Sequence, residues 1–141
     1  MSVGKRTIHI ESRTERLVAV REFVSAAARE CGFPDDEVSK IALAVDEACT
    51  NIIKHAYKFD PSKEITVTVK NRTGGLEIVI TDSGIGFDPS RIQSPDMKEY
   101  LIHYRHGGLG VYLMKSLMDK VEYKIIPGRH NEVHLTKFLA R

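Results

Sequence analysis

Glu47, Asn51 and His55 recur at every fourth position of the segment DEACTNIIKHAY, which spans residues 46–57. In an α-helix, residues four apart lie on one face, each turned by about 40° from the last. A carboxylate can accept a proton, an amide oxygen suits a hard cation, and an imidazole can contact phosphate. A nucleotide with magnesium would explain the three residues together, whereas the solvated face of an amphipathic helix would explain only their polarity.

The segment TDSGIGFDP places Asp82, Gly84 and Gly86 directly after a predicted strand. A carboxylate at the end of a strand can accept a hydrogen bond from the exocyclic amine of adenine, and glycines let the backbone approach the ring closely. An ordinary exit from a strand into a loop has the same composition, so both interpretations stay open. The chain contains neither a complete G-x-G-x-x-G fingerprint nor a G-x-x-x-x-G-K-[ST] motif, which excludes Rossmann-type and P-loop nucleotide binding.

The segment RHGGLGVYLMKSLMD places Gly107, Gly108 and Gly110 where a long loop ends and a helix is predicted to begin. Free N–H groups and the positive end of the helix dipole make such a junction a natural phosphate site. Arg105 could add a charged contact to a terminal phosphate. The alternatives are a hinge or close packing for the glycines and simple solvation for the arginine. An esterase loop is excluded, because no G-x-S-x-G elbow accompanies HGGL.

Two consecutive helices are predicted ahead of the glycine segments. The first runs from Thr14, placed as its N-cap, to about Glu30, where the pair CG ends it. The second starts after Pro34, where acidic residues favour a helix N-terminus, and reaches about Tyr57. The apolar residues of the second helix fall within one stripe that should pack on a sheet: Val38, Ile41, Ala42, Val45, Cys49, Ile52, Ile53 and Ala56.

Alternating segments rich in β-branched residues predict five strands, the last four of them in two hairpins. The strands are expected at residues 7–12, 63–71, 75–83, 120–126 and 132–139, with a third helix after the glycines at 107–110. Hairpins with helices between them indicate the α+β class, as a two-layer α/β sandwich whose mostly antiparallel sheet carries helices on one face. The length fits one domain, residues 1–141. Residues 84–107 form a long loop, with one short helical turn expected near MKEYLIHY, and such a loop is usually functional or disordered.

Composition and charge exclude several classes of function. The formal net charge is only +2 and the Lys and Arg residues are scattered, so no nucleic-acid partner is expected. No apolar run approaches the roughly 20 residues of a membrane helix, which predicts a cytoplasmic protein without a membrane partner. Cys31 and Cys49 are expected to be reduced and buried, and no zinc site is expected among the six histidines.

Taken in order, DEACTNIIKHAY, DSGIGFD and GGLGVYLMKSLMD resemble the N, G1 and G2 boxes of the GHKL superfamily of histidine-kinase-like ATPases. Within this superfamily the chain is similar to the small anti-sigma-factor serine/threonine kinases, which consist of the ATP-binding domain alone. The resemblance covers nearly all 141 residues. It implies the Bergerat-type ATP-binding fold, with ATP and Mg²⁺ as cofactors.

The resemblance also implies roles for individual residues. Glu47 would be the general base toward a protein hydroxyl, Asn51 the magnesium ligand, and Asp82 the residue that reads adenine. The rest of the nucleotide site would comprise His55, Gly84, Gly86, Arg105, Gly107, Gly108 and Gly110. Residues at about 88–107 would form a lid that closes over ATP, excludes water and orders the site.

One departure from the family pattern lies in the last hairpin. Such kinases often carry a Gly-Thr pair before the final strand, whereas this chain has Asn131 and Glu132. The resemblance therefore does not carry over the water-mediated adenine contact that is made at this position.

Family behaviour implies two protein partners, a sigma factor that is held inactive and a STAS-type anti-anti-sigma protein that is phosphorylated on Ser or Thr. Arg13, Arg16 and Arg21 alternate with apolar residues on the first helix. This helix could dock a sigma factor or a second copy of the chain, as in a homodimer, although a solvated helix face has the same pattern.

Three functions are compatible with these motifs. The first is an anti-sigma serine/threonine kinase that sequesters a sigma factor and phosphorylates its STAS-type partner. The second is a non-catalytic module, in which ATP only orders the lid and a surface for partners. The third is the catalytic domain of a split histidine kinase, which ranks last because no four-helix dimerisation segment is seen ahead of the ATP-binding motifs.

Overall fold

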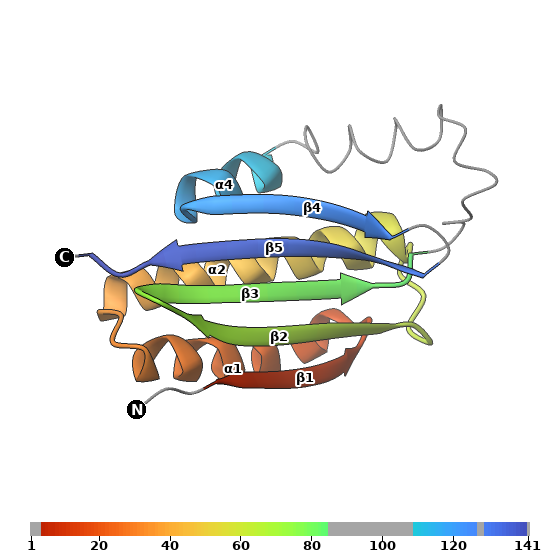
Figure 1. Cartoon of the computed structure of the whole chain (residues 1–141). Helices are drawn as coiled ribbons and strands as arrows, with labels where there is room; N and C mark the ends of the chain where they lie inside the picture. The colour runs from red at the N-terminus through yellow and green to blue at the C-terminus, as the bar shows by residue number, and fades with distance from the viewer. Residues whose placement is uncertain (1–3, 85–108, 127–128, 141) are drawn as a thin grey trace.

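The computed structural model describes residues 4–84, 109–126 and 129–140 of the chain. Its strands form one antiparallel sheet in the order β1-β2-β3-β5-β4 (Figure 1). The strands are β1 Lys5–Glu11, β2 Glu64–Arg72, β3 Gly75–Asp82, β4 Lys120–Ile126 and β5 His130–Phe138. The α-helices of the described residues are α1 Leu17–Glu30, α2 Asp35–Asn51 and α4 Leu109–Leu117, and they lie on one face of the sheet. The predicted two-layer α+β architecture is confirmed.

Alternation of side chains along the strands gives the sheet an apolar face that packs against the helices. Seven strand residues of this face are each at most 3% exposed: Ile65, Val67, Val69, Ile78, Ile80, Val133 and Leu135. The central helix α2 contacts both α1 and α4. Its predicted apolar stripe is buried except for Ala42, which is of intermediate exposure. Ala44 and Ala48 are buried as well, because α2 has a helix on either side.

The two long helices begin in different ways. α2 starts directly after Pro34, as predicted, with three acidic residues in its first turn, where the helix dipole favours negative charge. The prediction that Thr14 caps α1 is wrong, because Thr14–Arg16 form a short 3-10 turn and α1 starts at Leu17. The Thr14 hydroxyl donates to the carboxylate of Glu15 at 3.2 Å, which satisfies it without a backbone N–H.

The helical segment that starts with α2 changes its hydrogen-bond pattern after Asn51. Residues Ile52–Ala56 form a π turn. The N–H of Tyr57 donates to the carbonyl of Ile52, five residues earlier, at 2.8 Å. A π turn closes i→i+5 bonds and so rotates less per residue than an α-helix. The helical segment reaches Tyr57 as predicted, but the drift of about 40° per four residues applies from Glu47 to Asn51 only. His55 lies on the π turn.

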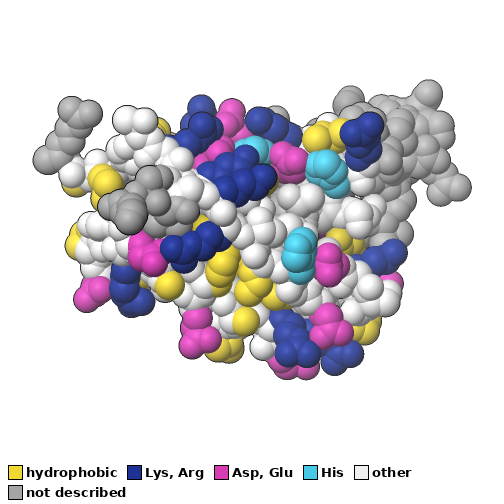
Figure 2. Space-filling model, turned by 60° about the horizontal axis from the view of Figure 1, so that its bottom comes forward, with side chains coloured by type: hydrophobic (Ala, Val, Ile, Leu, Met, Phe, Trp, Pro, Cys, Tyr) yellow, Lys and Arg dark blue, Asp and Glu magenta, His cyan; other side chains and the backbone are white. Residues whose placement is uncertain are grey.

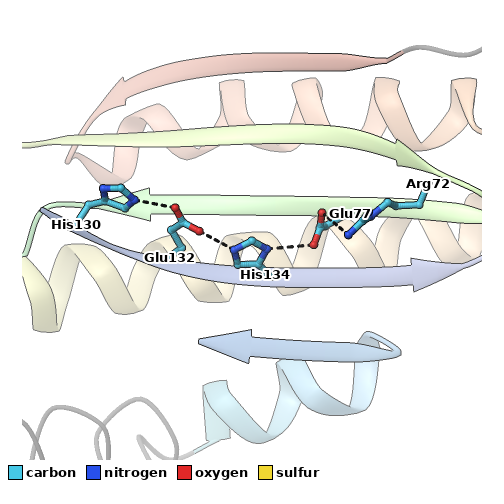
Figure 3. Close-up of polar contacts among 5 residues, drawn as sticks. All are labelled: Arg72, Glu77, His130, Glu132 and His134. Atoms are coloured by element: carbon cyan, nitrogen blue, oxygen red, sulfur yellow. Dashed lines mark hydrogen bonds and ion pairs between the residues drawn. The ribbon is translucent and has the colours of Figure 1, made fainter. Parts of the chain in front are cut away.

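The polar face of the sheet carries a chain of ion pairs across β3 and β5 (Figure 3). His134 is bonded on both ring nitrogens, to Glu77 at 3.1 Å and to Glu132 at 2.7 Å. Arg72 extends the chain beyond Glu77 at 3.2 Å, and His130 extends it beyond Glu132 at 2.7 Å. His134 therefore bridges the carboxylate of Glu77 on β3 and that of Glu132 on β5.

Both carboxylates of this chain are stabilised in their ionised form. Burial alone would raise the pKa of Glu77, but the hydrogen bond from His134 and the charge of Arg72 outweigh burial and lower that pKa. Burial would likewise raise the pKa of Glu132. The hydrogen bonds from His134 and His130 outweigh burial and lower that pKa as well. In the space-filling view of Figure 2, positive and negative side chains are interspersed, with histidines among them. Charges of both signs are therefore mixed on the side of the molecule in view.

Acid titration of the folded protein tests the ion chain. A carboxylate with a lowered folded pKa stabilises the fold above its unfolded pKa of about 4.3, and this contribution is lost as pH falls through the folded pKa. We expect the free energy of unfolding to fall between about pH 5 and pH 3 more steeply in the wild type than in Glu77→Gln, as measured by urea denaturation. Glu11→Gln, which removes an exposed carboxylate paired with Arg16, is the control and should keep the wild-type slope. Equal slopes for wild type and Glu77→Gln would contradict the expectation.

Candidate functional site

The carboxylate of Asp82 lies at the end of β3 and is almost completely buried. The residue is only 3% exposed, and its Oδ1 accepts two hydrogen bonds, from the N–H of Gly84 at 2.8 Å and from Nδ2 of Asn131 at 3.1 Å. Burial raises the pKa of Asp82, although both hydrogen bonds favour the ionised form. No hydrogen bond from the described residues reaches Oδ2, so this oxygen can accept one from a ligand.

Gly84 has no room for a side chain. A Cβ at this position would lie 2.9 Å from Asp82 Oδ1, 3.1 Å from Asn131 Nδ2 and 3.4 Å from the Cβ of Ala56. The glycine therefore lets the exit of β3 approach the π turn. This contact brings the π turn and the exit of β3 to the same end of the sheet (Figure 1).

Tyr57 fixes the backbone around this contact. Its buried hydroxyl donates to the carbonyl of Glu64 at 2.6 Å and accepts from the N–H of Ser83 at 2.7 Å, and burial raises its pKa. The chain then turns through Lys58 and Phe59, whose φ angles of 49° and 63° are left-handed. Such strain in residues other than glycine concentrates at functional sites. Sequence reasoning did not assign Tyr57 a role, because its partners are backbone groups that carry no sequence signal.

The predicted polar row is half-buried rather than freely solvated. Glu47, Asn51 and His55 are each of intermediate exposure. Within the part of the chain that the structure describes, the Nδ2 of Asn51 is buried and has no hydrogen-bond partner. A buried donor without an acceptor costs about 1–3 kcal/mol, so this amide fits a site that a polar ligand completes. Beside the row, the carboxylate of Asp46 is paired with Arg21 at 2.6 Å.

The predicted glycine turn ahead of α4 lies largely outside the described residues. Gly86, Arg105, Gly107 and Gly108 lie there, as do the expected lid at 88–107 and the helical turn near MKEYLIHY. Gly110 is the second residue of α4, so its N–H belongs to the first helical turn, which has no intrahelical acceptors. The other end of α4 is held by Lys137, whose Nζ donates to the carbonyl of Leu117 at 2.9 Å and lies 3.4 Å from the carboxylate of Glu37.

Over the described ranges, no group of three or more His, Cys, Asp or Glu side chains could hold a metal ion. Asn51 offers an amide oxygen to a hard cation. Mg²⁺ is usually held by few protein groups together with substrate phosphates, and the donor set here fits that mode of binding. The two cysteines are free, and burial raises the pKa of Cys49 to about 12, so its thiol is inert.

The family model of the histidine kinase-like ATPase domain matches residues 10–137 of the chain. The chain belongs to this family. Serine-protein kinase RsbW of Bacillus cereus (strain G9842) is 33% identical over 141 residues, which cover 97% of this chain and 86% of that protein. Serine-protein kinase RsbW of Bacillus licheniformis is 37% identical over 134 residues, which cover 92% of this chain and 82% of that protein.

Two solved structures share the fold of this histidine kinase-like ATPase domain. The RsbU and RsbW domains of a Mycobacterium tuberculosis protein match with a TM-score of 0.67 and 16% identity, over 97% of this chain and 33% of that longer chain. The SiaB-SiaC complex of Pseudomonas aeruginosa contains a chain that matches with a TM-score of 0.67 and 11% identity, over 93% of this chain and 88% of its own. Among the described residues, none of the helices has the length and apolar character that crossing a membrane requires.

Gly84→Ala tests the packing at the end of β3. A methyl group 2.9 Å from Asp82 Oδ1 must displace the carboxylate or the amide of Asn131, so we expect a loss of about 1–3 kcal/mol in the free energy of unfolding. Ser83→Ala is the matched control, since it removes only a hydroxyl 3.3 Å from that of Tyr57 and should cost less. Urea denaturation measures both, and a Gly84→Ala protein as stable as the wild type would show that the site is not packed in this way.

Proposed function

We propose that the chain is an ATP-dependent serine/threonine protein kinase that acts as an anti-sigma factor. One observation carries the proposal: the buried acceptor Asp82 lies where Gly84 approaches Ala56, at the end of the helical segment that also carries Asn51 and His55. A nucleotide could place its base at Asp82 and its phosphates along that segment. The relatives named serine-protein kinase RsbW, at 33% and 37% identity, support the kinase activity.

The base would be recognised at the end of β3. Oδ2 of Asp82 can accept a hydrogen bond from the exocyclic amine of adenine, and Gly84 and Gly86 are proposed to lie beside the ring. Guanine carries an acceptor oxygen where adenine carries this amine, so an ionised carboxylate would repel it. The proposed site is therefore selective for adenine.

The phosphates would lie between the polar row and the start of α4. The residues assigned to them are Asn51, His55, Arg105, Gly107, Gly108 and Gly110. The buried amide of Asn51, which lacks a partner within the described residues, is suited to this position. Asn51 would also hold Mg²⁺, which, when bound, neutralises charge on the phosphate oxygens. Residues at about 88–107 are proposed to close over the nucleotide, within the single domain 1–141.

Glu47 would act as the general base. It accepts the proton of a serine or threonine hydroxyl while the oxygen bonds to the γ-phosphorus, and the bond from that phosphorus to the bridging oxygen breaks, so that ADP leaves with the electron pair. The neighbouring Asp46 is already engaged by Arg21, whereas Glu47 forms no ion pair among the residues that the structure describes. Glu47 is therefore the carboxylate of this pair that is free to take a proton.

The proposed partners follow from the family resemblance. A STAS-type anti-anti-sigma protein would supply the hydroxyl, and a sigma factor would be sequestered while that protein is phosphorylated. The start of α1 and the 3-10 turn ahead of it, with Arg13, Arg16 and Arg21, are a proposed contact surface for the sigma factor or for a second copy of the chain. Arg21 is partly committed to Asp46, and Arg16 is paired with Glu11 at 3.0 Å.

Phosphate transfer to a STAS-type partner tests the role of Glu47. We expect Glu47→Gln to lower the transfer rate by about 100-fold or more, because a positioned base contributes roughly 10²–10⁴-fold, and to leave the affinity for Mg-ATP nearly unchanged. Asp46→Asn is the matched control and should retain most of the activity. Labelled ATP and a gel assay measure transfer, and calorimetry measures binding.

Other outcomes of that assay point to other functions. Full activity of Glu47→Gln removes the proposed base. Partner binding by the wild type without labelled product after long incubation indicates a non-catalytic module. A label that is lost in acid but stable in base indicates a phosphorylated histidine.

Asp82→Asn is expected to separate stability from binding. Burial raises the folded pKa of Asp82, so its contribution to stability is present below the unfolded pKa of about 3.9 and is lost as pH rises through the folded pKa. At pH 7 the neutral amide should therefore raise the melting temperature. Affinity for Mg-ATP should fall by about 10- to 100-fold, since a hydrogen bond to a charged acceptor is lost. A thermal melt and calorimetry check both, and a lower melting temperature or unchanged affinity would contradict the assignment.

A further inference from the structure

Asn131 lies opposite Asp82 in the ladder between β3 and β5, and it is only 5% exposed. Its Nδ2 donates to Asp82 Oδ1 at 3.1 Å, and the N–H of Gly84 donates to the same oxygen at 2.8 Å. An amide NH₂ and a backbone N–H can only donate. The two groups together hold Oδ1 as an acceptor and leave Oδ2 as the oxygen that a ligand can reach.

We propose that Asn131 is a positioning residue that sets the base specificity of the nucleotide site, because it presents Asp82 to the purine as an acceptor only. The inference rests on the proposed function, which assigns Asp82 to the base. It adds a residue at the position where the sequence departs from the family pattern.

The amide matters because a hydroxyl at this position would behave differently. A hydroxyl can donate or accept, so it tolerates a neighbouring carboxyl that carries a proton, whereas an amide NH₂ does not. Without the amide, Asp82 would keep only the hydrogen bond from Gly84, and burial favours the protonated acid. A protonated Asp82 can donate to the 6-oxo group of hypoxanthine or guanine. Loss of the amide would therefore weaken discrimination between 6-amino and 6-oxo purines.

The backbone that carries Asn131 is held from the opposite face of the sheet. His130 and Glu132, its two neighbours in the sequence, are bonded to each other at 2.7 Å, and Glu132 is bonded to His134 at 2.7 Å (Figure 3). These bonds hold the first residues of β5 in place, so the amide of Asn131 is directed at Asp82 by a braced strand. The charge of His130 also favours the carboxylate form of Asp82.

The test compares the affinities of the full chain for Mg-ATP and for Mg-ITP by calorimetry. ITP carries a 6-oxo group where ATP carries the 6-amino group, so the ratio of the two affinities reports on this contact. We expect the wild type to prefer ATP, and Asn131→Leu to reduce the ratio by about tenfold or more, mainly through weaker ATP binding. Asn131→Thr, which retains a donor, should give an intermediate ratio. A purely structural role would weaken both nucleotides equally and leave the ratio unchanged.

A folded Asn131→Leu protein with the wild-type ratio would overturn the inference and leave the proposed function standing. If Asn131→Leu does not fold, Asn131→Thr decides: an intermediate ratio supports the need for the amide, and a ratio equal to that of the wild type overturns it. Failure of the wild type to bind Mg-ATP at all would instead overturn the proposed function, and the inference with it.

Discussion

The burial of one carboxylate constrains the whole end of the sheet at which the site lies. Moving a charged group out of water is costly unless hydrogen bonds replace the water, and Asp82 is only 3% exposed. Its partners come from two segments, the loop after β3 and the first residues of β5. β5 must therefore pair with β3 in the register that sets Asn131 opposite Asp82, and Gly84 must lack a side chain. The position of one oxygen atom thus constrains residue types on two further segments of the chain.

The π turn and Tyr57 bring the helix layer to this same place. A buried phenol needs partners for its hydroxyl, and those of Tyr57 are the backbone of Glu64, at the start of β2, and of Ser83, just after β3. These two bonds therefore hold backbone, and a longer contact of 3.3 Å reaches the hydroxyl of Ser83. The end of the helical segment is tied to both strands of the hairpin, and Ala56 comes to lie against Gly84. A binding site that joins a helix to a strand end requires such a tie, because packing of the apolar stripe alone would leave the last turn free to shift.

Local patterns in the sequence predict the layers of the fold and the types of the site residues, but not the contacts between them. The apolar stripe of α2 and the two hairpins follow from periodicity, and the structure contains them. The prediction that Thr14 caps α1 is wrong. An N-cap is recognised in a sequence by its residue type, but the hydroxyl of Thr14 bonds instead to the carboxylate of Glu15, the next residue. The spacing of Glu47 and Asn51 indicates chemistry, yet the π turn after Asn51 has no local signal. The bond from Asn131 to Asp82 joins residues 49 positions apart, and it depends on every residue that fixes the strand register.

Alternation along β5 explains how a charged network on one face can matter to a site on the other. His130, Glu132 and His134 point to the polar face, and Asn131, which lies between the first two, points to the helix side. Glu77 and His134 are buried, whereas the outer partners Arg72 and His130 are more exposed. Exposed ion pairs typically contribute only about 0–1 kcal/mol, so the His130 end of the chain, next to Asn131, adds little to global stability. Its effect is local, because strand ends open more easily than strand centres and the bonded side chains oppose that opening. His130 and Glu132 are the sequence neighbours of Asn131, so bonds that hold their backbone also hold the backbone of Asn131. The ion pairs therefore need no direct contact with Asn131 through the sheet.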